Sequence, residues 1–306
     1  MHTTDELNER FAIPGVVSFD DDTGLTRARV TTSACTAEIY LQGAHLAAWQ
    51  PLQQQPVLFL SKRSFFRPGK AIHGGIPIIF PWFGARAATP ESPRTDGPSH
   101  GFARIEPWQL DFAALVGDDL HLSFSLAPTD LSRSLGFEAF RVAYQLTLGR
   151  ALHLRLTVAN DGDTPLHVGE AFHTYLHVGD VERARIQGLE GAEYLDKTED
   201  FRRRRQVEPV LTLHGETDRL YLDTAAPITI EDPVLHRRMT VTKKNSNNTV
   251  VWNPWATLAA SLSDMEPDGW RRMVCIETAN AAANALVLRP REAHVMETTI
   301  AVEELA

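Results

Sequence analysis

The chain has 306 residues, of which 43% are apolar and 23% charged, and this balance excludes disorder as its dominant state. Its 30 lysines and arginines against 39 aspartates and glutamates give a net charge of −9, which argues against a general nucleic-acid-binding protein. Its two cysteines, Cys35 and Cys275, exclude a disulfide framework and an all-cysteine zinc site, as is usual in a reducing compartment.

No stretch of the sequence approaches the ~18–20 consecutive apolar residues of a membrane span. The amino terminus is polar and acidic, without the basic start and apolar stretch of a secretion signal. We therefore expect a cytoplasmic protein that binds neither membranes nor nucleic acid. We also expect a monomer.

Alternation of apolar and polar residues with a period of two is the strongest secondary-structure signal. It runs through residues 120–126, 142–148 and 152–158, and it returns at 296–302. Side chains of a strand point alternately to the two faces of a sheet, so each run predicts a strand with one buried face. Short links join the first three runs, which predicts antiparallel neighbours. Helical periodicity is scarce, and residues 255–265 are the main candidate for a short helix.

These patterns predict an all-β, mainly antiparallel fold, a large sandwich, because no helices of ~10–15 residues separate the strands. Residues 87–99 have the composition of a linker, although a loop that forms a binding site has the same composition. The charge run Arg202–Arg205 is better explained by a solvated loop or strand edge than by a phosphate-binding patch. We expect a single domain over residues 1–306.

Four segments place polar or ionisable residues beside apolar and aromatic ones, namely Lys70–Gly84, Ser99–Arg104, Gly169–Val178 and Met273–Asn280. In the last of them, Glu277 follows an apolar run that is typical of a buried strand. Partial desolvation would raise the pKa of such a carboxyl group towards the range of a general base. Considered alone, a structural role explains Glu277 better than a catalytic one.

His173 stands among aromatic residues, where a hydrogen-bonded core histidine is the ordinary interpretation. On one strand its odd-numbered neighbours His167, Tyr175 and His177 would share its face. His173 and His177 would then lie about 13 Å apart at ~3.3 Å per residue, too far to share one ion. We therefore predict no metal site.

The sequence contains no Gly-x-Ser-x-Gly elbow, phosphate-binding P-loop or dinucleotide-binding glycine motif. Cys275 lies between apolar residues and is expected to be buried and inert rather than nucleophilic. Trp252 and Trp255 could form a platform for sugar stacking, but core packing explains them equally well. Asp218 could form a turn before a strand.

Six segments in this order together resemble the hexose-6-phosphate mutarotases, that is, the glucose-6-phosphate 1-epimerases of the aldose 1-epimerase (galactose mutarotase-like) superfamily. They are His73–Pro77, His100–Arg104, Phe172–Tyr175, Thr217–Tyr221, Val250–Trp255 and Cys275–Ala279. The resemblance extends from about Gly43 to the end of the chain. It implies a large antiparallel β-sandwich, a sugar or sugar phosphate bound in an open cleft on one sheet, and no metal or organic cofactor.

The resemblance also implies roles for individual residues. His173 matches the general acid of the family and Glu277 its general base. Asp218 matches an acidic residue that contacts sugar hydroxyls. His100 and Arg104 match substrate-site positions, and the arginine is a phosphate contact.

In the mechanism that this implies, Glu277 takes the proton of the anomeric hydroxyl while His173 donates one to the ring oxygen. The C1–O5 bond opens, the aldehyde turns about C1–C2, and the ring closes on its other face. Each group must therefore act both as acid and as base. We expect the two side chains to flank the pyranose ring from opposite sides.

His73 departs from the family pattern, which commonly has an arginine that grips the phosphate at this position. A neutral imidazole offers one donor and no charge, whereas a guanidinium offers a bidentate fork. Candidate replacements are Arg67, Lys70 and Arg86. A free aldohexose therefore remains an alternative substrate, and a non-catalytic carbohydrate-binding or regulatory protein, or a lyase or isomerase on the same scaffold, remains an alternative function.

Overall fold

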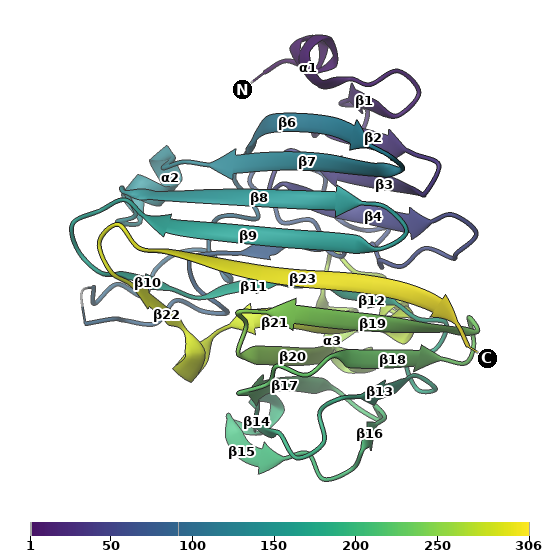
Figure 1. Cartoon of the computed structure of the whole chain (residues 1–306). Coiled ribbons are helices and arrows are strands. Elements are labelled where there is room, and N and C mark those ends of the chain that lie inside the picture. Colours follow the sequence, from purple (N-terminus) through teal and green to yellow (C-terminus); the bar gives the residue numbers. More distant parts are fainter. Residues whose placement is uncertain (1, 91, 306) are drawn as a thin grey trace.

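Two large antiparallel sheets lie face to face in the computed structural model, which describes residues 2–90 and 92–305. The first sheet has nine strands and descends through Figure 1 from β6 at the top to β16 near the bottom. In spatial order its strands are β16 (Val210–Leu211), β13 (Arg185–Gln187), β18 (Ile228–Asp232), β19 (Arg237–Lys244), β23 (Ala293–Glu304), β9 (Leu152–Asn160), β8 (Phe140–Leu148), β7 (Asp119–Leu126) and β6 (Gln109–Val116).

The second sheet has eight strands and carries most of the residues discussed below. Its order is β15 (Arg202–Arg205), β14 (Glu193–Asp196), β17 (Thr217–Leu222), β20 (Asn248–Asn253), β21 (Met273–Asn280), β11 (Glu170–Phe172) and β5 (Ile78–Ile79), and β12 (Tyr175–His177) also pairs with β21. The two short strands β10 (Leu166–Val168) and β22 (Leu286–Leu288) pair separately.

The predicted alternation places the core between the sheets. In β7, β8 and β9 every second residue is buried, and the residues between them are more exposed. The rings of Tyr144 on β8 and Phe172 on β11 lie 5.8 Å apart, and the Thr278 and Thr298 hydroxyls bond at 3.1 Å between β21 and β23. These contacts connect one sheet to the other, and the predicted antiparallel sandwich is confirmed.

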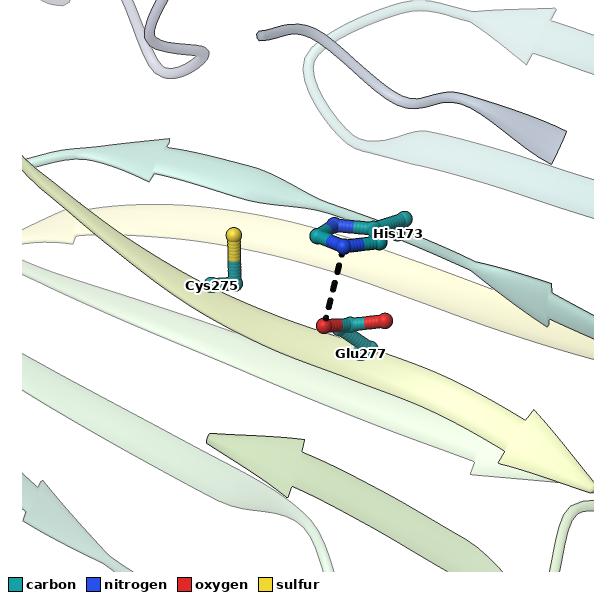
Figure 2. A group of neighbouring side chains, drawn as sticks. All are labelled: His173, Cys275 and Glu277. Carbon is teal, nitrogen blue, oxygen red and sulfur yellow. Dashed lines mark ion pairs between the residues drawn. The ribbon is translucent and has the colours of Figure 1, made fainter. Parts of the chain in front are cut away.

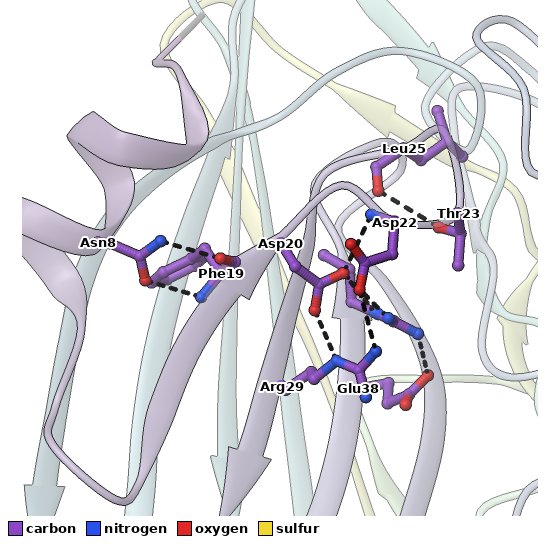
Figure 3. A network of polar contacts seen from close by, with 9 residues as sticks. Asn8, Phe19, Asp20, Asp22, Thr23, Leu25, Arg29 and Glu38 are labelled. Atoms are coloured by element: carbon purple, nitrogen blue, oxygen red, sulfur yellow. Dashed lines mark hydrogen bonds and ion pairs between the residues drawn. The ribbon is translucent and has the colours of Figure 1, made fainter.

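The first fifty residues form a separate four-stranded sheet with a helix packed on it. Its strands are β1 (Val17–Asp20), β2 (Arg27–Thr31), β3 (Cys35–Tyr40) and β4 (His45–Pro51), and the helix is α1 (Thr4–Phe11). The Asn8 side chain donates to Phe19 O and accepts from Phe19 N, both at 2.9 Å, which ties α1 to β1 (Figure 3). Arg27 is held between Asp20 and Glu38, so two carboxylates compensate its buried charge.

The remaining helices are short: α2 (Asp130–Ser134), α3 (Trp255–Ser261), η1 (Lys197–Glu199), η2 (Gly269–Arg272) and η3 (Ala282–Asn284). The helix expected over residues 255–265 thus ends four residues early. Arg202–Arg205 forms the exposed edge strand β15, as a solvated strand edge requires. No helix in residues 2–90 and 92–305 is long and apolar enough to cross a membrane.

The paired glycines let the chain pass very close to β4. Gly74 and Gly75 both have positive φ, of 117° and 62°. A Cβ atom on Gly75 would overlap Leu46 O and lie 2.8 Å from the Ala47 Cα atom, so no other residue fits without a shift of backbone. This close approach fixes the loop that begins with His73.

Gly75→Ala is expected to lower the free energy of unfolding by about 1–3 kcal/mol through overpacking, in addition to about 1–2 kcal/mol for the left-handed conformation. Gly69→Ala is the matched control, because Gly69 has a φ of 74° but nothing within 4 Å of an added Cβ atom. Denaturant unfolding of both variants measures the difference. Equal losses of stability would show that the close approach to β4 is not a constraint.

Candidate active site

One row of side chains crosses four strands of the eight-stranded sheet. The register places Asp218 opposite Trp252, Trp252 opposite Cys275 and Cys275 opposite Tyr175, on β17, β20, β21 and β12. Directly opposite residues point to the same face of a sheet, and Glu277 follows Cys275 by two positions on β21, so its side chain shares that face. This face looks away from the nine-stranded sheet.

His173 lies between β11 and β12, where pairing with β21 continues in one register. Phe172 is opposite Thr278 and Tyr175 is opposite Cys275, which leaves His173 opposite Glu277. The Nε2 atom of His173 lies 3.4 Å from Oε1 of Glu277, as Figure 2 shows by a dashed line. Two residues 104 positions apart in the sequence therefore meet because neighbouring strands align them.

Two loops bring further side chains to this face. The loop at Gly74 and Gly75 carries His73, and the segment after residue 98 carries His100 and Arg104. His100 has a positive φ of 64°, and its ring lies 5.4 Å from that of His173. Residues 87–99, ambiguous in the sequence, lead into this second loop.

The strands and loops enclose a pocket of about 290 Å³. All six residues predicted for the site line it. The full lining is Ala71, Ile72, His73, Phe83, His100, Arg104, His173, Tyr175, Lys197, Asp218, Trp252, Leu262, Asp264 and Glu277. A larger groove lies elsewhere, on the strands β7 to β9 and β23, and contains none of these residues.

The pair of His173 and Glu277 is almost entirely buried, with 7% and 1% of the two residues exposed. Burial raises the pKa of Glu277 well above its usual value, although the cations Lys197 and Arg104 oppose that shift. Burial lowers the pKa of His173 well below its usual value, and the cationic neighbours lower it further. Both shifts favour the uncharged forms, so the pocket is suited to hold one proton that either group can carry.

The remaining charges of the pocket are largely paired. Lys197 Nζ lies 2.9 Å from Asp218 Oδ1, and His73 Nδ1 lies 3.1 Å from Asp264 Oδ1. Arg104 donates to the carbonyl oxygen of Ser99, and its Nε atom is buried without a hydrogen-bond partner among the residues that the structure describes. The guanidinium is therefore the cation of the pocket that most needs an anion, since burial also lowers its pKa.

Sequence comparison matches the chain to a known protein family. The sequence profile of the aldose 1-epimerase family matches residues 27–301. An Escherichia coli (strain K12) protein named "Putative glucose-6-phosphate 1-epimerase" is 33% identical over 262 residues, which are 86% of this chain and 85% of that protein. A Salmonella typhimurium (strain LT2) protein of the same name is 32% identical over 262 residues, which are 86% of this chain and 85% of that protein.

Solved structures with a similar fold are also described as mutarotases or mutarotase-like proteins. A crystal structure described as "a putative mutarotase (YeaD)" from Salmonella typhimurium superposes with a TM-score of 0.88 at 30% identity, over 96% of each chain. A galactose mutarotase-like protein from Clostridium acetobutylicum superposes with a TM-score of 0.71 over 94% of this chain and 98% of that one, and at 14% identity it shows the fold alone.

The chain belongs to the aldose 1-epimerase family. The predicted galactose mutarotase-like fold is thereby confirmed, as is the assignment to the isomerases that interconvert the anomers of aldoses.

Several details differ from the sequence-based expectations for this family member. His173 and Glu277 do not stand on opposite sides of a sugar-sized gap but lie side by side, 3.4 Å apart. Asp218 lies within β17 and not in a turn. His167 belongs to the separate strand β10, so it does not share the face of His173 as expected.

The cations that line the pocket also differ from those expected to replace the arginine at position 73. Arg67, Lys70 and Arg86 do not line the pocket, and Arg86 bonds instead to the backbone of Leu135. Lys197 also lines the pocket, and sequence reasoning missed it because it lies in η1, directly after β14, and belongs to no motif. Trp252 lines the pocket, whereas Trp255 packs against Trp270 with ring centroids 4.3 Å apart.

The imidazole of His173 is expected to stay neutral at and below pH 6.5, its usual pKa, because desolvation and nearby cations oppose its protonation. Nitrogen chemical shifts of the histidine side chains, followed against pH, measure this, and His173→Gln assigns the signal. Half-protonation at or above pH 6.5 would contradict the desolvated pair.

Proposed function

We propose that this aldose 1-epimerase interconverts the α and β anomers of a hexose 6-phosphate, with glucose 6-phosphate as the favoured substrate. The observation that supports the chemistry is the buried contact of 3.4 Å between His173 and Glu277 at the wall of a sugar-sized pocket. Adjacent acid and base groups fit a hemiacetal, because its O1 and O5 atoms are bonded to the same carbon.

Ring opening then needs two proton transfers. The form of the pair that reacts is the minor one, in which the shared proton lies on His173. Glu277 as carboxylate then accepts the proton of the O1 hydroxyl, and His173 as imidazolium donates its Nε2 proton to O5 as the C1–O5 bond breaks. Glu277 becomes neutral and His173 becomes neutral, which is the state that burial favours. Rotation about C1–C2 and the reverse transfers give the other anomer, and no covalent intermediate forms.

Other pocket residues orient the sugar in this proposal. Asp218, held by Lys197, accepts hydrogen bonds from sugar hydroxyls, and His100 lies beside His173 near the reacting edge. Trp252 and Tyr175 present ring surfaces, with centroids 5.9 Å apart, against which the apolar face of a pyranose packs. In ring opening Glu277 accepts the O1 proton of the sugar and His173 supplies the proton that O5 receives, so the two side chains handle both proton transfers.

Glu277→Gln is expected to slow enzyme-catalysed anomer exchange by roughly 10²–10⁴-fold, because an amide cannot accept the O1 proton. Exchange between α- and β-glucose 6-phosphate is measured by saturation-transfer NMR. Glu193→Gln, a change of an exposed glutamate on β14, serves as the matched control, and circular dichroism checks both folds.

Unchanged exchange in Glu277→Gln would remove Glu277 from the mechanism. Sugar binding by the wild-type chain with exchange no faster than in buffer would instead support the alternative of a non-catalytic carbohydrate-binding protein.

Arg104 is the proposed phosphate contact. Its Nε atom is buried and has no hydrogen-bond partner among the described residues, and Arg104 belongs to neither of the ion pairs Lys197–Asp218 and His73–Asp264. The relatives named glucose-6-phosphate 1-epimerase are consistent with this choice of substrate. One observation favours a second candidate, a free aldohexose: His73 stands where the family has an arginine, and Asp264 at 3.1 Å offsets any charge it carries.

The wild-type chain is expected to prefer glucose 6-phosphate to glucose, and Arg104→Gln to reduce that preference in kcat/KM by about 10–100-fold, the value of a charge-assisted contact. Exchange rates on both sugars at two salt concentrations measure the preference and its screening. Arg67→Gln, a change outside the pocket, is the control. A wild-type chain without preference for the phosphorylated sugar would favour the free aldohexose.

A further inference from the structure

Cys275 lies beside the pair of His173 and Glu277 without lining the pocket. Figure 2 shows the three side chains as neighbours. Their ligand atoms lie within 4.8 Å of one another, and all three residues are buried. The thiol and the Glu277 carboxyl group share a face because they stand two residues apart on β21, and the Glu277 Oε2 atom is buried without a hydrogen-bond partner. The acid–base chemistry makes no use of the thiol.

The separations match those in a zinc site. Two nitrogen or oxygen ligands at about 2.0–2.1 Å from a tetrahedral zinc ion stand roughly 3.3–3.4 Å apart. His173 Nε2 and Glu277 Oε1 already lie 3.4 Å apart. The Cys275 sulfur lies at most 4.8 Å from one ring nitrogen of His173 and one carboxylate oxygen of Glu277, so side-chain rotations that close about 1 Å complete three ligand positions.

The chemistry of the three ligands also favours zinc. Thiolate, imidazole and carboxylate are the ligand types that Zn²⁺ binds in proteins, and the pocket leaves a fourth position open to water. One thiolate and one carboxylate neutralise the ion, so no net charge is buried beside Arg104 and Lys197. Burial raises the pKa of the Cys275 thiol, and zinc displaces the thiol proton when it binds.

We propose that His173, Cys275 and Glu277 form an inhibitory Zn²⁺ site, in which the ion occupies the acid–base pair and excludes the hemiacetal. The metal has no part in turnover: it takes the Nε2 and Oε1 atoms that anomer exchange requires. The inhibition rests on the proposed function of this pair, whereas the binding of zinc rests on the three ligands alone. A soft divalent ion thereby becomes a reversible off-switch for the enzyme.

Competition of the untagged full-length chain with a chromogenic chelator for Zn²⁺ tests binding without any sugar. Cys275→Ser is expected to weaken binding by at least about 100-fold, since loss of even an outer-shell partner costs about 10–100-fold. Cys35→Ser is the matched control, because Cys35 is the other buried cysteine and lies on β3, outside the cluster. With Co²⁺ as probe, a thiolate-to-metal charge-transfer band should appear in the wild type and in Cys35→Ser but not in Cys275→Ser.

Equal zinc affinity in the wild type and Cys275→Ser, or a Co²⁺ spectrum without the thiolate band, overturns the site. His173→Gln provides a second ligand deletion if Cys275→Ser does not fold, and unchanged affinity there has the same meaning. Addition of Zn²⁺ should stop anomer exchange and a chelator should restore it. Tight zinc binding with undiminished exchange overturns the inhibition, whereas a chain that binds zinc but exchanges no anomers refutes the proposed function and not the site.

Discussion

The contact between His173 and Glu277 depends on how the central strand β21 is buried. All eight residues of this strand are buried, although only one of its faces looks into the sandwich core. On the other face the pocket loops cover it, so the carboxyl group is removed from most water without being enclosed in apolar core. Burial in that position disfavours the charged form of both the carboxyl group and the imidazole. A single proton that the two groups share leaves both of them uncharged.

The surrounding charges also shift the pKa values of Glu277 and His173. Lys197 and Arg104 lower the pKa of Glu277, against the larger effect of burial, while Asp218 raises it. The cations act on His173 in the direction that keeps it neutral. Because Lys197 and His73 are each beside a carboxylate, Arg104 keeps the positive charge that an anionic substrate group would neutralise. The pocket thus combines the pair of His173 and Glu277 with one guanidinium, that of Arg104, which forms no close ion pair within residues 2–90 and 92–305.

The sandwich supplies rigidity at the residues to which the proposed chemistry is assigned. Strands position Asp218, Trp252, Tyr175 and Glu277, and their relative places are set by backbone hydrogen bonds in fixed register. The histidines His73 and His100 lie on loops, which are constrained at Gly74, Gly75 and Gly101, where an added Cβ atom would meet backbone atoms. These close approaches restrict the backbone of the two loops that carry the histidines.

The sequence alone determined the fold class, since the alternation of residues 120–158 is a local property that reports a half-buried strand. It also determined the family and the residue types of the site, because six short segments keep their order and identity. Only the tertiary structure decided that His173 faces Glu277, that Lys197 completes the pocket, that Asp264 accompanies His73 and that Cys275 lies beside the acid–base pair. Those relations are set by pairing between strands and loops distant in the chain, and no local pattern encodes which residues come to lie opposite one another.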